Sequence, residues 1–119
     1  MVKNRILIID DEPLVIVSLL QYLSENDYDV VATNSSEAAI SLINPRGLDV
    51  IITDYKMEPL DGIEVIKFFR SKGFDGKIIL ISAFCHLSKT EMDTLKIDFF
   101  FEKPFEIKNI HNKLKEWFR

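Results

Sequence analysis

The stretch Ile6-Leu7-Ile8-Ile9-Asp10-Asp11-Glu12-Pro13 decides the fold of this chain. Its four consecutive aliphatic residues are typical of a β-strand that is buried on both faces. Acidic residues follow at once, and Pro13 suits the first turn of a helix. Three later apolar runs are also followed directly by a polar or charged side chain. Those side chains are Asp54 after residues 50–53, Ser82 after residues 78–81, and Lys103 after residues 99–102.

Short apolar runs alternate with helical patterns from one end of the chain to the other. Strands are expected at residues 6–9, 30–32, 50–52, 78–81 and 99–101, and because these runs are continuous each strand is expected to be buried on both faces. Apolar residues at helical spacing predict helices at residues 13–26, 36–43, 63–71, 88–95 and 107–118. This (βα)5 alternation predicts one α/β domain over residues 1–119, with a doubly wound parallel sheet of five strands. The expected strand order is the flavodoxin-like 2-1-3-4-5.

Composition narrows the class of protein. Hydrophobic residues make up 47% of the 119 residues, and no apolar stretch is long enough to cross a membrane. The net charge of -4 gives no reason to expect nucleic-acid binding by this domain. Cys85 is the only cysteine, and the first residues carry no signal-peptide pattern, so a cytoplasmic location is expected.

The polar residues at the strand ends form a chemically coherent set. In a doubly wound sheet, ligands bind beyond the carboxyl ends of the strands, at the switch point between strands 1 and 3. Asp10, Asp11 and Asp54 would repel one another there unless a hard cation such as Mg²⁺ lay between them. Lys103 and Ser82 would supply a positive charge and a hydroxyl donor to a phosphoryl group. Asp54 is either a third metal ligand or a nucleophile that forms an aspartyl phosphate.

Each of these residues also has an ordinary structural explanation when it is taken alone. Asp10 and Asp11 would suit the amino end of a helix as capping residues. Asp54 could open a turn, Ser82 could be a strand-end hydroxyl, and Lys103 could be a solvated loop residue. The combination favours the phosphoryl site over these separate explanations.

The whole chain resembles the receiver domain of bacterial two-component response regulators. The matching pieces are Ile8-Ile9-Asp10-Asp11-Glu12-Pro13, Asp54-Tyr55-Lys56-Met57 with Asp61-Gly62 beyond, Ser82-Ala83, and Lys103-Pro104-Phe105. The resemblance implies that Asp54 is the phosphoacceptor and that Lys103 contacts the phosphoryl group. It implies Mg²⁺ as cofactor, held by Asp10, Asp11, Asp54 and the backbone carbonyl of Lys56. It also implies Ser82 as the switch hydroxyl, Phe100 as the switch aromatic, and a cis Lys103–Pro104 peptide bond.

The function implied by the resemblance is Mg²⁺-dependent transfer of a phosphoryl group from a partner phosphohistidine to Asp54. The partner would be a sensor histidine kinase or a histidine phosphotransfer protein. The domain would modify itself and would not be an enzyme that turns over an external substrate. A phosphorylation-dependent homodimer through the fourth helix, fifth strand and fifth helix is one possible output. Two alternatives stay open: an interaction module that signals without phosphorylation, and a Mg²⁺-dependent aspartyl-phosphate phosphatase.

The sequence departs from the family pattern in three places, one of which is Lys96-Ile97, where the family usually has Gly-Ala before the fifth strand. Glu58 separates Met57 from Pro59 and adds a negative charge near the expected site. The segment between Ser82 and Lys103 is about one residue short, so the fourth helix is expected to be short or irregular. Phe84 is predicted to shield an acyl phosphate from water. No role is assigned to Cys85, His86 or His111, the histidines being expected at the surface, and Trp117 is expected to pack the last helix on the sheet.

Overall fold

The computed structural model describes residues 2–83 and 87–118. The strands are β1 (Arg5–Ile9), β2 (Asp29–Thr33), β3 (Val50–Asp54), β4 (Lys77–Ser82) and β5 (Phe99–Glu102). The helices are α1 (Pro13–Glu25), α2 (Ser36–Leu42), α3 (Gly62–Ser71), α4 (Lys89–Leu95) and α5 (Ile107–Trp117). Each element begins and ends within two residues of the position expected from its apolar pattern. No helix within the described ranges is long and apolar enough to cross a membrane.

The five strands form one parallel sheet in the order β2-β1-β3-β4-β5. The predicted (βα)5 fold and strand order are therefore confirmed. In the register of the central strands, Ile9 lies beside Thr53, and Asp54 lies beside Ile81. This register brings the carboxyl ends of β1, β3 and β4 to one edge of the sheet.

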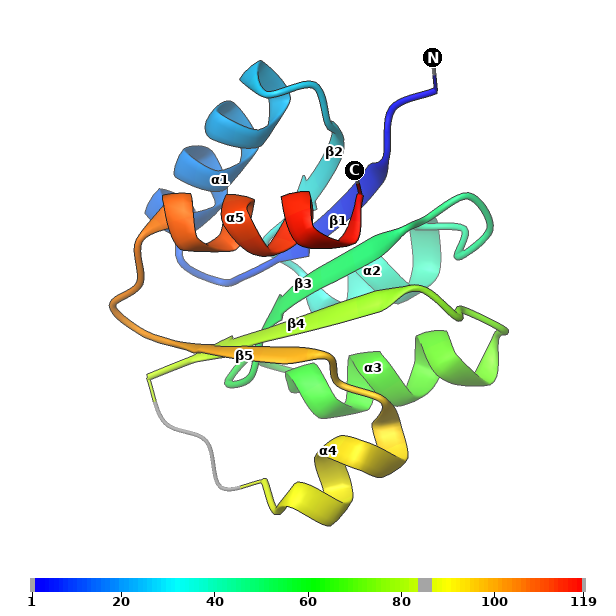
Figure 1. The fold of residues 1–119 in the computed structure, drawn as a ribbon. Helices are drawn as coiled ribbons and strands as arrows, with labels where there is room; N and C mark the ends of the chain where they lie inside the picture. Colours follow the sequence, from blue (N-terminus) through cyan, green and yellow to red (C-terminus); the bar gives the residue numbers. More distant parts are fainter. Residues whose placement is uncertain (1, 84–86, 119) are drawn as a thin grey trace.

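Two hydrophobic layers cover the sheet, one on each face. Leu19 and Leu23 of α1 and Ile110 and Leu114 of α5 pack on one face. Helices α2 and α3 cover the opposite face with a core that includes Phe69. Figure 1 shows this division, with α4 lying below α3 at the β5 end of the sheet. The central strands are buried on both faces because helices cover each side.

The two edge strands are less buried than their apolar sequences suggest. Residues 30–33 of β2 are half-buried, and β5 has exposed residues at both ends. Phe99 at the start of β5 is 36% exposed. Burial on both faces was expected for all five runs, and that expectation is wrong for β2 and β5. An edge strand has a neighbour on one side only, so part of its surface stays open to water.

Helix α4 is short, as the shortened segment indicates. It has seven residues, and none of them is buried. Ser88 and Glu91 form the capping box that their spacing indicates: the Ser88 hydroxyl accepts the Glu91 amide, and the Glu91 carboxylate accepts the Ser88 amide. The shielding role predicted for Phe84 lies outside the described residues, as do Cys85 and His86.

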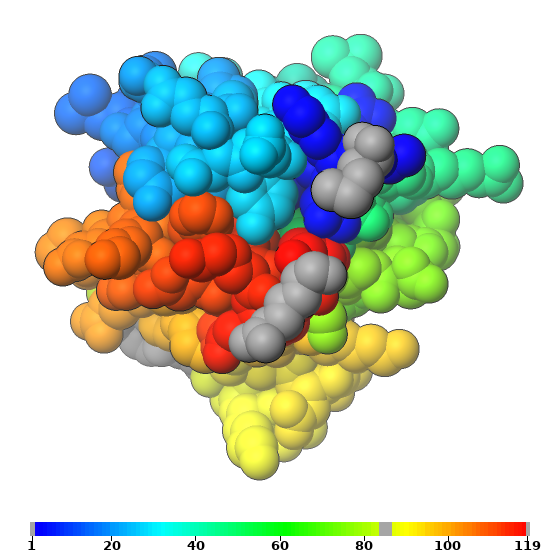
Figure 2. All heavy atoms as spheres, turned by 45° about the horizontal axis from the view of Figure 1, so that its top comes forward, coloured from blue at the N-terminus to red at the C-terminus, as the bar shows by residue number. Residues whose placement is uncertain are grey.

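Helices α1 and α5 lie side by side on one face of the molecule, as Figure 2 shows. His111 of α5 is half-buried and makes edge-on ring contacts with Tyr22 and Tyr28. His111, expected at the surface, is therefore only partly exposed. Burial lowers the pKa of His111, and the nearby Lys115 charge lowers it further. Trp117 packs against the sheet-facing cluster, with the Lys77 ammonium over its ring.

Candidate functional site

The carboxyl edge of the sheet places the predicted side chains around one hollow. Asp54 is the last residue of β3, Ser82 is the last of β4, and Lys103 directly follows β5. All three line the hollow together with Asp11, Glu12 and Lys56. Asp10 follows β1 and is buried beneath them, at 1% exposure. Residues from four strands thus reach a common point because parallel strands end at a common edge.

Lys103 lies at the centre of a group of carboxylates. Its Nζ is 2.7 Å from Glu12 Oε1, 3.1 Å from Asp10 Oδ2 and 3.3 Å from Asp54 Oδ2. The lysine side chain is 14% exposed, and the Asp10 and Asp54 side chains are nearly inaccessible. One ammonium therefore contacts three carboxylates, of which Asp10 and Asp54 are buried and Glu12 is exposed.

The buried carboxylate of Asp10 has one oxygen in use and one available. Oδ1 accepts the Glu12 amide at 2.8 Å, so Asp10 closes the turn after β1. Oδ2 is buried and receives no well-formed hydrogen bond, although the Lys103 ammonium lies nearby. Asp10 does not cap α1: Glu12 holds the N-cap position, and its side chain makes no capping bond. A buried carboxylate oxygen without a donor is suited to binding a cation.

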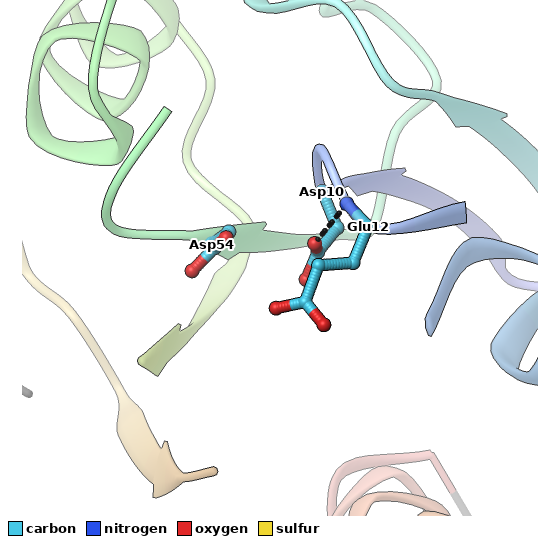
Figure 3. A group of neighbouring side chains, drawn as sticks. All are labelled: Asp10, Glu12 and Asp54. Atoms are coloured by element: carbon cyan, nitrogen blue, oxygen red, sulfur yellow. Dashed lines mark hydrogen bonds between the residues drawn. The ribbon is translucent and has the colours of Figure 1, made fainter. Parts of the chain in front are cut away.

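Carboxylate oxygens of Asp10, Glu12 and Asp54 lie within 4.8 Å of one another. Figure 3 shows Asp10 and Glu12 coming from the turn after β1, and Asp54 from the neighbouring strand end. Hard oxygen ligands at this spacing fit Mg²⁺, which commonly takes one or two carboxylates and keeps several waters. The donor set therefore fits the metal that the sequence predicts.

The close carboxylate group differs from the predicted ligand set by one residue. Asp11 is exposed and lines the hollow but is not a member of the close group, whereas Glu12 is. Sequence reasoning assigned Glu12 no role. The sequence did contain a signal for it: Glu12 follows β1 directly, in the same run of three acidic residues as Asp10 and Asp11. Lys56, whose backbone carbonyl was predicted to complete the metal shell, also lines the hollow.

The electrostatics of the hollow disfavour an ionised Asp54 when no cation is bound. Burial, reinforced by the negative charge of Asp10, raises the pKa of Asp54 to about 6, although Lys103 opposes the shift. Burial also raises the pKa of Asp10, against the Glu12 amide and Lys103. Burial on its own would lower the pKa of Lys103, but the neighbouring carboxylates of Glu12, Asp10 and Asp54 raise it overall. A divalent cation would favour the ionised carboxylates for the same electrostatic reason.

Backbone contacts fix the position of Asp54. Its Oδ1 accepts the Tyr55 amide at 2.8 Å, and the Tyr55 amide also reaches the Ile81 carbonyl at 2.9 Å. The Gly62 amide donates to the Tyr55 carbonyl at 2.7 Å, which holds the start of α3 against the end of β3. Asp61 caps α3 through a capping box with Glu64. The carboxylate thus points into the hollow from a rigid support.

Of the remaining predicted residues, Ser82 lines the hollow and Phe100 packs against the hydrophobic core. Ser82 is 3% exposed and lies on the wall of the hollow. Phe100 is half-buried and packs against the core on the α3 side. It belongs to β5, and β4 separates that strand from β3, which carries Asp54. The Lys103–Pro104 peptide bond is cis, and so is Glu58–Pro59. Glu58 is exposed and lines the hollow.

Comparison with known proteins agrees with the fold and identifies the family. The family model of the response regulator receiver domain matches residues 6–115. The chain therefore belongs to the response regulator receiver domain family. It is a receiver domain of the response-regulator type, with an acidic pocket formed by Asp10, Glu12 and Asp54.

Two curated relatives illustrate the family. The chain is 32% identical to the alkaline phosphatase synthesis transcriptional regulatory protein PhoP of Bacillus subtilis, over 95% of this chain and 48% of that protein. It is 29% identical to the heme response regulator HssR of Staphylococcus saprophyticus, over 92% of this chain and 49% of that protein. The chain spans about half the length of the curated relatives it matches.

Solved structures share the fold over nearly the whole chain. The non-phosphorylated HemR receiver domain of Leptospira biflexa superimposes with a TM-score of 0.87 at 22% identity, covering 96% of this chain and 93% of that one. The chemotaxis protein CheY4 of Vibrio cholerae gives 0.85 at 21% identity, covering 97% and 98%. The receiver domain of the Francisella response regulator 1452 gives 0.81 at 27% identity, covering 96% and 95%.

Proposed function

We propose that Asp54 accepts a phosphoryl group from a phosphohistidine of a partner protein, and that residues 1–119 act as a phosphorylation-controlled signalling domain. The observation that carries the proposal is the position of the Asp54 carboxylate. It is buried at the end of β3, 3.3 Å from the Lys103 ammonium and beside the Asp10 carboxylate. A nucleophilic carboxylate, a fixed cation and an acidic metal site are the components that phosphoryl transfer requires.

Each residue of the site has a separate role in the phosphoryl transfer. Asp54 Oδ2 attacks phosphorus, the bond from phosphorus to the donor's imidazole nitrogen breaks, and that nitrogen keeps the electron pair. Oδ1 stays oriented by the Tyr55 amide. Lys103 pairs with the charge on the phosphoryl oxygens, and Ser82 offers them a hydroxyl. Asp10, Asp54, the Lys56 carbonyl, and either Asp11 or Glu12 would hold Mg²⁺, which would neutralise negative charge on the transferring group.

The partner that donates the phosphoryl group is a sensor histidine kinase or a histidine phosphotransfer protein. An apolar groove suited to a helical segment of such a partner runs beside the hollow. Leu14, Val15 and Leu19 of α1 form one side, and Pro104 and Phe105 form the other. Leu14 is 81% exposed, so this apolar side chain of the groove is accessible to a partner. The groove shares Glu12 and Lys103 with the hollow, so a segment seated there would bring its histidine to Asp54.

Phosphorylation is transmitted through Ser82 and Phe100 in this proposal. Ser82 moves toward a phosphoryl oxygen, and the half-buried Phe100 ring turns into the space that is vacated. The face that responds comprises α4, β5 and α5, and its output is a contact with an effector or a second copy of the chain. Aromatic residues of β5 and α5 lie on this face, with the Lys113 ammonium 4.1 Å from the centre of the Phe99 ring.

In this function the domain is a cytoplasmic acceptor that modifies itself. Two other functions predict different products from the same incubation. A phosphatase would release inorganic phosphate from an external substrate in amounts that exceed the protein. A module that signals without phosphorylation would take up no phosphate at all.

A labelling experiment separates these outcomes. The protein is incubated with Mg²⁺ and a small phosphodonor, either acetyl phosphate or phosphoramidate, while intact mass, released phosphate and elution volume are followed. One phosphoryl adduct per chain is expected, and it should be absent after chelation of the metal and in Asp54→Asn. Asp75→Asn removes an exposed aspartate before β4 and should label normally. An unlabelled wild type, or labelling that persists in Asp54→Asn, would overturn the proposal.

A further inference from the structure

The ion pair between Glu12 and Lys103 stands apart from the other contacts of the hollow. At 2.7 Å it is the shortest of the three approaches to the ammonium, and it is 0.6 Å shorter than the approach to Asp54 (3.3 Å against 2.7 Å). The Glu12 side chain is also the accessible member of the group, at 59% exposure against 1% for Asp10 and 5% for Asp54. The shortest contact of Lys103 is therefore with the carboxylate that can most easily leave.

We propose that Glu12 is a positioning residue for Lys103: its carboxylate holds the ammonium on the Glu12 side of the hollow in the unmodified protein and releases it when Asp54 becomes phosphorylated. The inference rests on the proposed function, because it concerns a competitor of the phosphoryl group for Lys103. It assigns Glu12 a role that does not depend on metal coordination.

The charge balance supports this role. Phosphorylation replaces the single negative charge of Asp54 with a phosphoryl group that carries nearly two at neutral pH. Lys103 is the cation within reach of Asp54 in the described part of the site. Asp10 is buried and tied to the Glu12 amide, so it cannot move away. Glu12 can turn into water at little cost, and its carboxylate would otherwise repel the arriving phosphodonor.

The position of Glu12 links this release to partner contact. Glu12 and Lys103 line both the apolar groove beside α1 and the acidic hollow, so their ion pair forms the wall between the two. Figure 3 shows that Glu12 extends from the turn ahead of α1, separate from the strand that carries Asp54. A segment entering the groove therefore meets Glu12 before it meets Asp54.

Glu12→Gln tests the inference because glutamine keeps the shape and the hydrogen-bonding oxygen while removing the charge. At saturating Mg²⁺, we expect labelling by acetyl phosphate to be about three- to fivefold faster than in the wild type, the range typical of one exposed ion pair. The ratio of the two rates should fall toward one in concentrated salt, because salt screens an exposed charge. A purely structural role would not produce that salt dependence.

Glu58→Gln is the matched control. Glu58 lines the same hollow and is exposed, but within the described ranges it forms no ion pair with Lys103. The same substitution there should change the labelling rate by no more than about 1.5-fold, since a charge without a direct partner is largely screened. A second readout needs no activity: the Lys103 ammonium protons, followed by NMR, should exchange with water faster in Glu12→Gln and unchanged in Glu58→Gln.

Several results would overturn the inference. Equally faster labelling in Glu12→Gln and Glu58→Gln would show that any negative charge lining the hollow slows the reaction. Slower labelling in Glu12→Gln, together with a tenfold or greater loss of affinity for Mg²⁺ in a titration, would show that Glu12 is a metal ligand. Normal labelling of the wild type with no change in Glu12→Gln would reject the role of Glu12 and leave the proposed function intact. Failure of the wild type itself to label would instead reject the proposed function.

Discussion

Gly62 lies against the backbone of Asp54, and this contact determines where the loop after β3 can run. A Cβ atom at position 62 would collide with the Asp54 carbonyl oxygen. The Gly62 amide at the same time donates to the Tyr55 carbonyl. The close approach of two backbone segments here requires a residue without a side chain.

Gly62→Ala is expected to displace Asp54 as well as to weaken the fold. Relief of the collision must move backbone, so a loss of about 1–3 kcal/mol in the free energy of unfolding is expected. Because Asp54 shares the displaced backbone, labelling by acetyl phosphate should slow by roughly tenfold or more. Urea unfolding and intact-mass kinetics would measure the two effects.

Gly47→Ala provides the comparison. Gly47 has a φ of +84° with open space around the position of a Cβ, so alanine there meets backbone strain without a collision. A loss of about 1–2 kcal/mol with an unchanged labelling rate is expected. Equal labelling rates in the two variants would show that Gly62 matters for stability alone.

At the scale of elements, α4 is held to the rest of the domain by the partly buried side chains of Met92 and Leu95 and by hydrogen bonds at its carboxyl end. None of its seven residues is buried. The Arg70 guanidinium of α3 donates to the carbonyls of Leu95 and Lys96, at 3.0 and 2.7 Å, where α4 ends. It also donates to the carbonyls of Phe74 and Gly76 in the turn before β4. A cation at this point satisfies terminal carbonyls that the helix itself leaves without partners.

Arg70→Met should therefore loosen α4 more than any other element. Hydrogen bonds from a charged donor to four carbonyls are lost, and a decrease of about 2–3 kcal/mol in the free energy of unfolding is expected. Hydrogen exchange should become faster in residues 89–97 while β1 and β3 stay protected. Lys67→Met, an exposed lysine on the same helix, should alter neither measurement. A uniform rise in exchange across the sheet would contradict a local role for Arg70.

At the scale of the whole molecule, the buried acids connect stability to pH. The pKa of Asp54 rises from 3.8 to about 6 on folding, and that of Asp10 also rises. Between pH 4 and 6 the folded protein therefore binds more protons than the unfolded chain, so ionisation of Asp54 opposes folding as the pH rises. The sign is opposite to that of a surface carboxylate in a favourable ion pair.

Without metal, Asp54→Asn should be more stable than the wild type at pH 7, and the two should converge near pH 4. The difference at pH 7 is expected to be roughly 3 kcal/mol at most, the value that corresponds to the shift in pKa. Unfolding by urea at several pH values would measure it. Mg²⁺ should stabilise the wild type more than the variant. A difference that does not vary between pH 4 and 7 would show that Asp54 is not the titrating group.

The effect of His111 on stability changes with pH in the opposite direction to that of Asp54. Its pKa is lowered in the folded protein, so its contribution to stability is lost as the pH falls through the ordinary range of histidine, near 6.5. Because both proteins in the comparison contain His111, its effect cancels in their difference.

Much of this architecture could be predicted from the sequence, for a definite physical reason. Strands buried on both faces must be apolar throughout, so Ile6–Ile9 and its counterparts are visible as continuous runs. Residues that follow such runs share one edge of a parallel sheet whatever the details of packing. Asp10, Asp54, Ser82 and Lys103 could therefore be grouped from their positions alone.

Only the tertiary structure decided which side chains pair within that group. The Glu12–Lys103 contact joins residues 91 positions apart, and no local pattern encodes the direction in which a long side chain turns. The exposure of Asp11 and the hold of Arg70 on α4 likewise depend on where separate elements meet. The sequence by itself determined the fold and the membership of the site, because both follow from periodicity and strand order. The partners of Lys103 depend on ångström-scale packing, which arises only when the elements are assembled.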